Sequence, residues 1–196
     1  KIVSVGAPGL AVGTVIDNVL YVQTTKGAAK GRIVAVDAAA PDLTKGRVLV
    51  PERDNAVIES VGVAKGRIAV SYLMNASNTV EVFDLAGASQ GTLTLPGIGS
   101  ASVTAEPDRT EAYLTFTSFN YPPSIFQIDL ASPAKAGSLW EQPKVPVDPS
   151  SVEVEQVWYP SKDGTKISMF LVHKKGLAKN GRIPTLLTGY GGFNIS

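Results

Sequence analysis

The chain has 196 residues, with 18 Lys or Arg against 17 Asp or Glu, so its formal net charge is +1. So small a basic excess argues against nucleic acid or an anionic membrane surface as a partner. Cysteine is absent, which excludes disulfides, thiolate metal sites and a Cys nucleophile. No apolar stretch approaches the roughly 18 residues that span a bilayer. A cytoplasmic location is expected, with the periplasm or secretion left open, because proteins without disulfides occur in each compartment.

Short β-type runs follow one another over the first three quarters of the chain. They are rich in Val, Ile, Thr and aromatic residues and are bounded by Gly, Pro, Asn or Asp. Apolar residues do not recur at helical spacing over residues 1–150, so no helix longer than a single turn is expected there. The predicted runs lie at 14–25, 31–37, 46–52, 56–74, 78–85, 91–96, 101–108, 111–119 and 124–130.

These runs repeat. The segments "IVAVD", "VEVFD" and "IFQID" end at Asp37, Asp84 and Asp129, which are 47 and 45 residues apart. Similar strands precede and follow each of them, and four strands per roughly 40–50 residues is typical of a propeller blade. Each Asp is expected to accept backbone N–H bonds in the turn after its strand. A calcium or substrate role is the alternative, but the ligand spacing of a calcium loop is missing.

Residues 1–144 are therefore predicted to form a partial β-propeller of about three blades, ending near residues 52, 97 and 144. Three blades cannot close a ring, because propellers need roughly four to eight. The first and last blades should then expose apolar side chains. The missing blades would come from sequence outside this chain or from a partner chain.

The composition changes at "EQPKVPVDPSS" (141–151), which reads as a linker. Two strands are predicted after it, on either side of the turn "SKDG" (161–164), whose Asp-Gly pair is a strong hairpin signal. A polar turn and a third strand, "TLLTGY" (185–190), should follow.

Few residues offer catalytic chemistry. His173 is the sole histidine and is expected to be a polar residue at a strand end, rather than a base or a zinc ligand. No G-x-S-x-G or phosphate-loop pattern occurs. The glycines of "GYGG" (189–192) either form a simple turn or let the backbone approach a substrate closely. In the second case the hydroxyl of Tyr190 could donate to a developing oxyanion.

The pieces "YPSKDGTKI", "MFLVHKKG" and "GYGGFNIS" closely resemble the prolyl oligopeptidase family of serine peptidases. The earlier segments "VLVPE", "NTVEVFDL" and "FTSF" look like the C-terminal blades of that family's seven-bladed propeller. The resemblance implies a mainly β chain in which the propeller blades lead into the first strands of an α/β-hydrolase domain, over residues 145–196. The chain departs from the family pattern at two positions, Ser168 and Thr188.

The resemblance implies hydrolysis of short peptides on the carboxyl side of proline, with the propeller gating access to a Ser-Asp-His triad. By the same resemblance, Tyr190 donates to the oxyanion and Phe193 lines the substrate pocket, with no cofactor. The triad has no counterpart here, so the chain is expected to be an inactive segment whose partners are short proline-containing peptides and the remainder of the enzyme. The alternative is a non-catalytic propeller that binds peptides or proteins. A nucleophile elbow beyond Ser196 would favour the enzyme.

Overall fold

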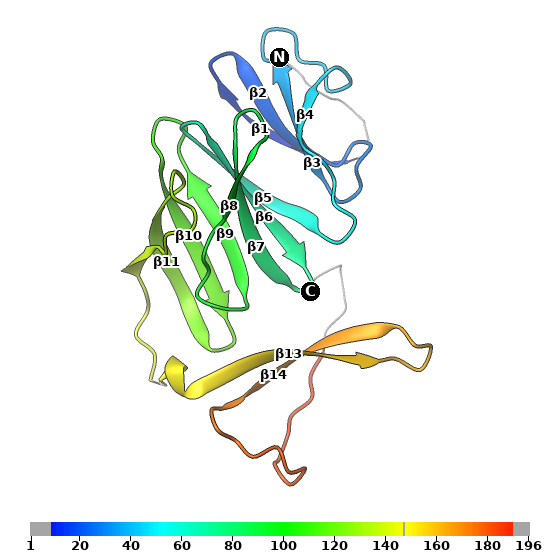
Figure 1. Ribbon diagram of the computed structural model, residues 1–196, viewed down its shortest axis with the longest axis vertical. Coiled ribbons are helices and arrows are strands. Elements are labelled where there is room, and N and C mark those ends of the chain that lie inside the picture. The colour runs from blue at the N-terminus through cyan, green and yellow to red at the C-terminus, as the bar shows by residue number, and fades with distance from the viewer. Residues whose placement is uncertain (1–8, 147, 190–196) are drawn as a thin grey trace. The chain divides into compact units, whose positions relative to one another are not determined.

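The computed structural model describes residues 9–146 and 148–189. The chain divides into two compact units after Pro143, and each is described by itself (Figure 1). Within the described ranges the helical structure is limited to one 3-10 turn, so no helix there could cross a bilayer. The expectation of no helix beyond a single turn is confirmed for these residues.

The first unit consists of three four-stranded antiparallel sheets. In each sheet the order of strands in space follows the order in the sequence. This is the arrangement of propeller blades, so the predicted four-stranded repeat is confirmed. The first sheet holds β1 (Ala11–Ile16), β2 (Val19–Thr24), β3 (Arg32–Asp37) and β4 (Arg47–Val50). The second holds β5 (Val57–Ala64), β6 (Arg67–Met74), β7 (Ser77–Asp84) and β8 (Ser89–Thr92), and the third holds β9 (Ser100–Ala105), β10 (Glu111–Ser118), β11 (Tyr121–Asp129) and β12 (Ser138–Glu141).

Two of the hydrophobic core clusters lie between neighbouring sheets. Side chains that alternate along the middle strands point toward the next sheet, because successive residues of a strand face opposite sides. One cluster joins the first and second sheets through residues that include Ile33, Val70 and Tyr72. Another joins the second and third sheets through residues that include Val82 and Leu114. The stacking of the three sheets therefore depends on apolar burial, which contributes about 25 cal/mol per Å².

Turn chemistry explains the ends of the strands. The pairs Asp17-Asn18 and Asn75-Ala76 have positive φ at both residues, as two-residue hairpin turns require. Each repeated Asp caps the turn after its third strand: Asp37 accepts a backbone N–H at 2.7 Å and Asp129 at 2.9 Å. Asp84 accepts two backbone N–H bonds, at 2.9 and 2.8 Å. The predicted capping role of all three is confirmed.

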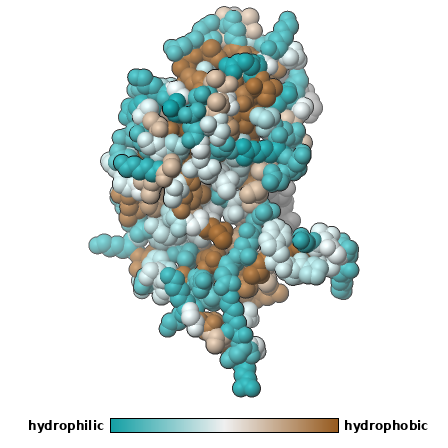
Figure 2. Space-filling view, viewed as in Figure 1, coloured by the Kyte–Doolittle hydropathy of each residue, from teal (hydrophilic) through white to brown (hydrophobic). Residues whose placement is uncertain are grey.

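The first and last sheets expose apolar side chains, as predicted for an open stack. Val15 of β1 is 56% exposed, on the face of the first sheet that is turned away from the second, and Trp140 of β12 is 60% exposed. Figure 2 shows an apolar patch at the top of the view, where the first sheet lies. These side chains offer surface for further sheets to cover.

The first regular element of the second unit is the 3-10 turn Pro149–Ser151, which Asp148 caps by accepting the N–H of Ser150 at 2.9 Å. The hairpin of β13 (Val152–Pro160) and β14 (Lys166–Lys174) follows. Its strands pair in unbroken register from Val152–Lys174 to Pro160–Lys166. The turn between them contains Gly164 with φ +85, so the predicted Asp-Gly hairpin is confirmed.

The predicted third strand at 185–190 is wrong over the part that the structure describes. Residues 185–189 are not in a strand, and the side chains of Leu186 and Leu187 are 90% and 79% exposed. A strand needs a neighbouring strand to accept and donate its backbone hydrogen bonds. The described residues of the second unit supply only the β13–β14 pair, in which this segment takes no part.

Candidate functional site

The residues predicted to contact substrate, Tyr190 and Phe193, lie outside the described residues. The candidate site is built instead from the hairpin that precedes them and from the segment 175–189.

Both faces of the β13–β14 hairpin carry large apolar side chains, and one of them also carries Glu153, Glu155 and His173. The register places Val157, Ile167, Met169 and Leu171 on one face. Val154, Trp158, Phe170 and Val172 lie on the other. A two-stranded hairpin is marginally stable alone, and strands that are apolar on both sides belong inside a layered sheet. Trp158 and Val172 are still 48% and 47% exposed here, so this hairpin has the composition of covered strands.

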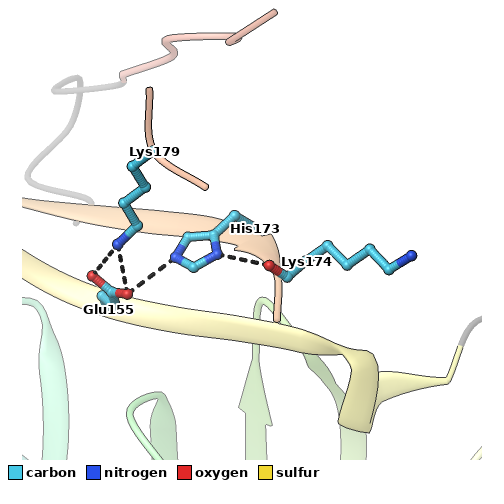
Figure 3. A network of polar contacts seen from close by, with 4 residues as sticks. All are labelled: Glu155, His173, Lys174 and Lys179. Atoms are coloured by element: carbon cyan, nitrogen blue, oxygen red, sulfur yellow. Dashed lines mark hydrogen bonds and ion pairs between the residues drawn. The ribbon is translucent and has the colours of Figure 1, made fainter. Parts of the chain in front are cut away.

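His173 lies at the penultimate position of β14, as the sequence predicts for a polar residue at a strand end. Its side chain is only 12% exposed. Nε2 lies 3.1 Å from Oε1 of Glu155 and Nδ1 lies 3.0 Å from the carbonyl oxygen of Lys174 (Figure 3). Because both ring nitrogens already face oxygen atoms, neither is directed at a nucleophile. The geometry does not suit a general base.

Glu155 is the centre of an ion-pair cluster, formed by Glu155, His173 and Lys179. Lys179 Nζ donates to both carboxylate oxygens of Glu155, each at 2.7 Å. In Figure 3 the carboxylate lies between the ammonium group and the imidazole ring. The hydrogen bond from Lys179, followed by that from His173, lowers the pKa of Glu155. The pKa of His173 is raised by its hydrogen bond to the Lys174 carbonyl and then by Glu155.

Glu153 adds a second carboxylate near this cluster. It pairs with His173 across the hairpin, and ligand atoms of Glu153, Glu155 and His173 all lie within 4.8 Å of one another. Such a spacing would suit a divalent ion, but Lys179 already holds a positive charge on both oxygens of Glu155. We therefore describe an ion-pair cluster and not a metal centre.

Sequence reasoning missed this cluster. The strict pairing set by the Asp-Gly turn brings Glu153 opposite His173, and that signal could have been used. The contact with Lys179 could not be derived in the same way, because Lys179 follows the strand in an irregular turn.

Comparisons with known proteins show to which family this chain belongs. The family model described as "Prolyl oligopeptidase, N-terminal beta-propeller domain" matches residues 10–138. The chain belongs to the prolyl oligopeptidase family. It is 34% identical to a prolyl endopeptidase of Elizabethkingia meningoseptica over 178 residues, which is 90% of this chain and 25% of that protein. It is 35% identical to prolyl oligopeptidase A of Amanita bisporigera over 182 residues, 91% of this chain and 24% of that protein.

Solved structures of the family agree with the fold. A structure from a study of two prolyl endopeptidases superposes with a TM-score of 0.83 at 38% identity, covering 98% of this chain and 28% of that chain. Prolyl oligopeptidase B of Galerina marginata superposes with a TM-score of 0.78 at 27% identity, covering 90% of this chain and 26% of that chain. The chain thus spans about a quarter of the length of the relatives that it matches. The resemblance read from the sequence motifs is confirmed at the level of the family.

Proposed function

We propose that this chain is a segment of a serine oligopeptidase that hydrolyses short peptides on the carboxyl side of proline. The observation that carries the proposal is the match to prolyl endopeptidases along nearly the whole chain, at 34% identity over 178 residues. It extends beyond the propeller into the hairpin, because the structural match covers 98% of the chain. In a related prolyl oligopeptidase B, a 35-residue hydrolysis and macrocyclization substrate is bound.

In this proposal the three sheets are blades of a propeller that gates the access of peptides. The β13–β14 hairpin supports the proposal that the propeller blades lead into the first strands of an α/β-hydrolase domain. The apolar side chains on both of its faces suit strands near the start of an α/β-hydrolase domain, where helices and further strands would cover them. Residues 182–189 would then lead into that domain's sheet, directly before Tyr190.

Tyr190 is proposed as the oxyanion donor. A phenol hydroxyl held in a site shielded from water stabilises the alkoxide that forms when a serine attacks the peptide carbonyl. The glycines on either side of Tyr190 leave room for the substrate backbone. Phe193 would pack against the bound peptide in the same site. The serine, the acid and the histidine of the triad are proposed to lie in the rest of the protein.

The mechanism is tested by Tyr190→Phe in the intact enzyme. Loss of one oxyanion donor should lower kcat by about 10- to 1000-fold, with a much smaller change in KM. Tyr159→Phe is the matched control, because Tyr159 is an exposed tyrosine of the hairpin. It should leave kcat unchanged. An unaltered kcat in the Tyr190 variant would remove this hydroxyl from the mechanism.

The function is tested separately with a fluorogenic Gly-Pro reporter. The intact protein should cleave it, and the purified 196-residue chain should not, because the chain's one histidine is held by Glu155 and by a backbone carbonyl. Turnover by the chain alone would contradict the proposal that the catalytic triad lies in the rest of the protein. A parent sequence without a nucleophile elbow beyond Ser196 would favour a peptide-binding propeller instead.

A further inference from the structure

The hydrogen bonds of His173 depend on its protonation state. Nδ1 and Nε2 each face an oxygen that can only accept, the Lys174 carbonyl and the Glu155 carboxylate. A neutral imidazole carries one N–H, so either tautomer turns a lone pair toward one of these oxygens. The imidazolium carries two and can donate to both. The geometry therefore fits the charged form of the ring better than either neutral form.

The surroundings of the ring are mixed in charge. Glu153 and Glu155 face it from β13, and both favour the imidazolium. Lys179 reaches the same carboxylate from the turn that follows β14 and opposes a second positive charge. The Lys174 amino group points away from the ring in Figure 3, so this residue acts through its carbonyl oxygen.

The turn that carries Lys179 has two different attachments to the hairpin. At its start, the N–H of Lys175 donates to the carbonyl of Ser151 at 2.9 Å, a backbone bond that does not depend on pH. Further along, Lys179 reaches back to Glu155 through its side chain. Glu155 in turn is oriented by His173. The later part of the turn is thus linked to the ring through one shared carboxylate.

We propose that His173 is a proton-operated latch: its protonated ring holds Glu155 in place for Lys179 and so fastens the turn 175–181 to the hairpin, whereas the neutral ring loosens it. This inference does not depend on the proposed peptidase function. It would stand for a peptide-binding propeller as well. It also gives a role to the single histidine, which the proposed chemistry does not use.

The direction of the pH effect follows from the two pKa shifts. The pKa of His173 is raised above its ordinary 6.5, so its contribution is complete below pH 6.5 and is lost as the pH rises through the raised pKa. The pKa of Glu155 is lowered below its ordinary 4.5, so its contribution is complete above pH 4.5 and is lost as the pH falls through the lowered pKa. The latch is therefore fully closed between about pH 4.5 and 6.5 and opens on the alkaline side.

The first test follows the ring itself. The intact protein carrying this sequence is labelled with 13C at histidine Cε1, kept in a metal chelator and titrated by NMR, and His173→Gln identifies the resonance. His173 should titrate above pH 6.5. Glu155→Gln should lower its pKa, and Lys179→Met should raise it. Titration of His173 at or below pH 6.5, or an unchanged pKa in Glu155→Gln, would overturn the latch.

The second test follows the turn. Amide hydrogen exchange of residues 175–181, corrected for the intrinsic effect of pH, should rise about two- to five-fold between pH 6 and pH 9, the range expected for loss of one exposed ion pair. In His173→Gln the corrected exchange should not change with pH. Residues 57–64 of β5 provide an internal reference that should stay constant in both proteins. Equal pH dependence of the turn in both proteins would refute the proposal.

Discussion

A buried hydroxyl in the second sheet makes a sharp test of how the sheets are packed. Tyr72 is 1% exposed and lies in the cluster between the first and second sheets. Its hydroxyl oxygen is buried and has no hydrogen-bond partner among residues 9–146 and 148–189. Burial raises the pKa of Tyr72 to about 12, so the hydroxyl keeps its proton. An O–H group therefore remains in the core without an acceptor from the described part of the chain.

Tyr72→Phe should stabilise the protein. The ring keeps its apolar contacts and its place beneath Arg53, whose guanidinium carbon lies 4.1 Å from the ring centroid. Only the unpaired hydroxyl is removed, and such a group costs about 1–3 kcal/mol when it is buried. After the smaller loss of its own packing, we expect a gain of about 1 kcal/mol. In a domain of this size that is roughly 2–4 °C in Tm.

The assay is thermal and urea unfolding of the parent protein, Tyr72→Phe and a matched control. Tyr113→Phe is the control, because Tyr113 also lies in the second strand of its sheet but donates its hydroxyl proton to Glu111 at 3.1 Å. The Tyr113 variant should have a lower Tm than the parent. A Tyr72→Phe protein that melts at or below the parent temperature would refute the reasoning.

Two further substitutions test the turns and the contact between sheets. Asp84→Ala removes the acceptor of two backbone N–H bonds and should lower the urea midpoint more than Asp129→Ala, which removes the acceptor of one; equal midpoints would contradict the capping account. Gly62→Ala places a Cβ 2.9 Å from the carbonyl oxygen of Val103 in the next sheet, so it should cost about 1–3 kcal/mol by overpacking. A Gly62→Ala protein with unchanged Tm would show that the second and third sheets can separate slightly without loss.

The strands of the first unit could be predicted because their signals are local. Period-two alternation, turn residues and the repeated Asp at 37, 84 and 129 all act within a few positions of one another. Several strand ends differ from the prediction: for example, the sequence predicts a strand over 91–96, but β8 spans Ser89–Thr92. Leu93 still donates its N–H to Val80 and is buried. The apolar pattern therefore predicts correctly that Leu93 is buried, although the regular strand pairing of β8 has already ended.

The Glu155 cluster could be predicted only in part, because its members come from different kinds of structure. Glu155 and His173 are joined by strand register, which a hairpin turn determines. Lys179 reaches them from an irregular turn, and no periodic pattern places it there. Its contact depends on the path of a few residues between two charged groups, which composition and spacing do not encode.

The segment before Tyr190 shows why a catalytic tyrosine can be proposed from sequence and yet not positioned by it. Leu186 and Leu187 are apolar and nearly fully exposed, an arrangement that costs free energy unless other elements cover them. Backbone groups at 185–189 likewise need strand neighbours, which the β13–β14 pair does not provide. The position of residues 185–189 must therefore depend on packing around this segment rather than on its own turn chemistry. A sequence motif can suggest which group donates a hydrogen bond, but the position of that group depends on the elements that pack around it.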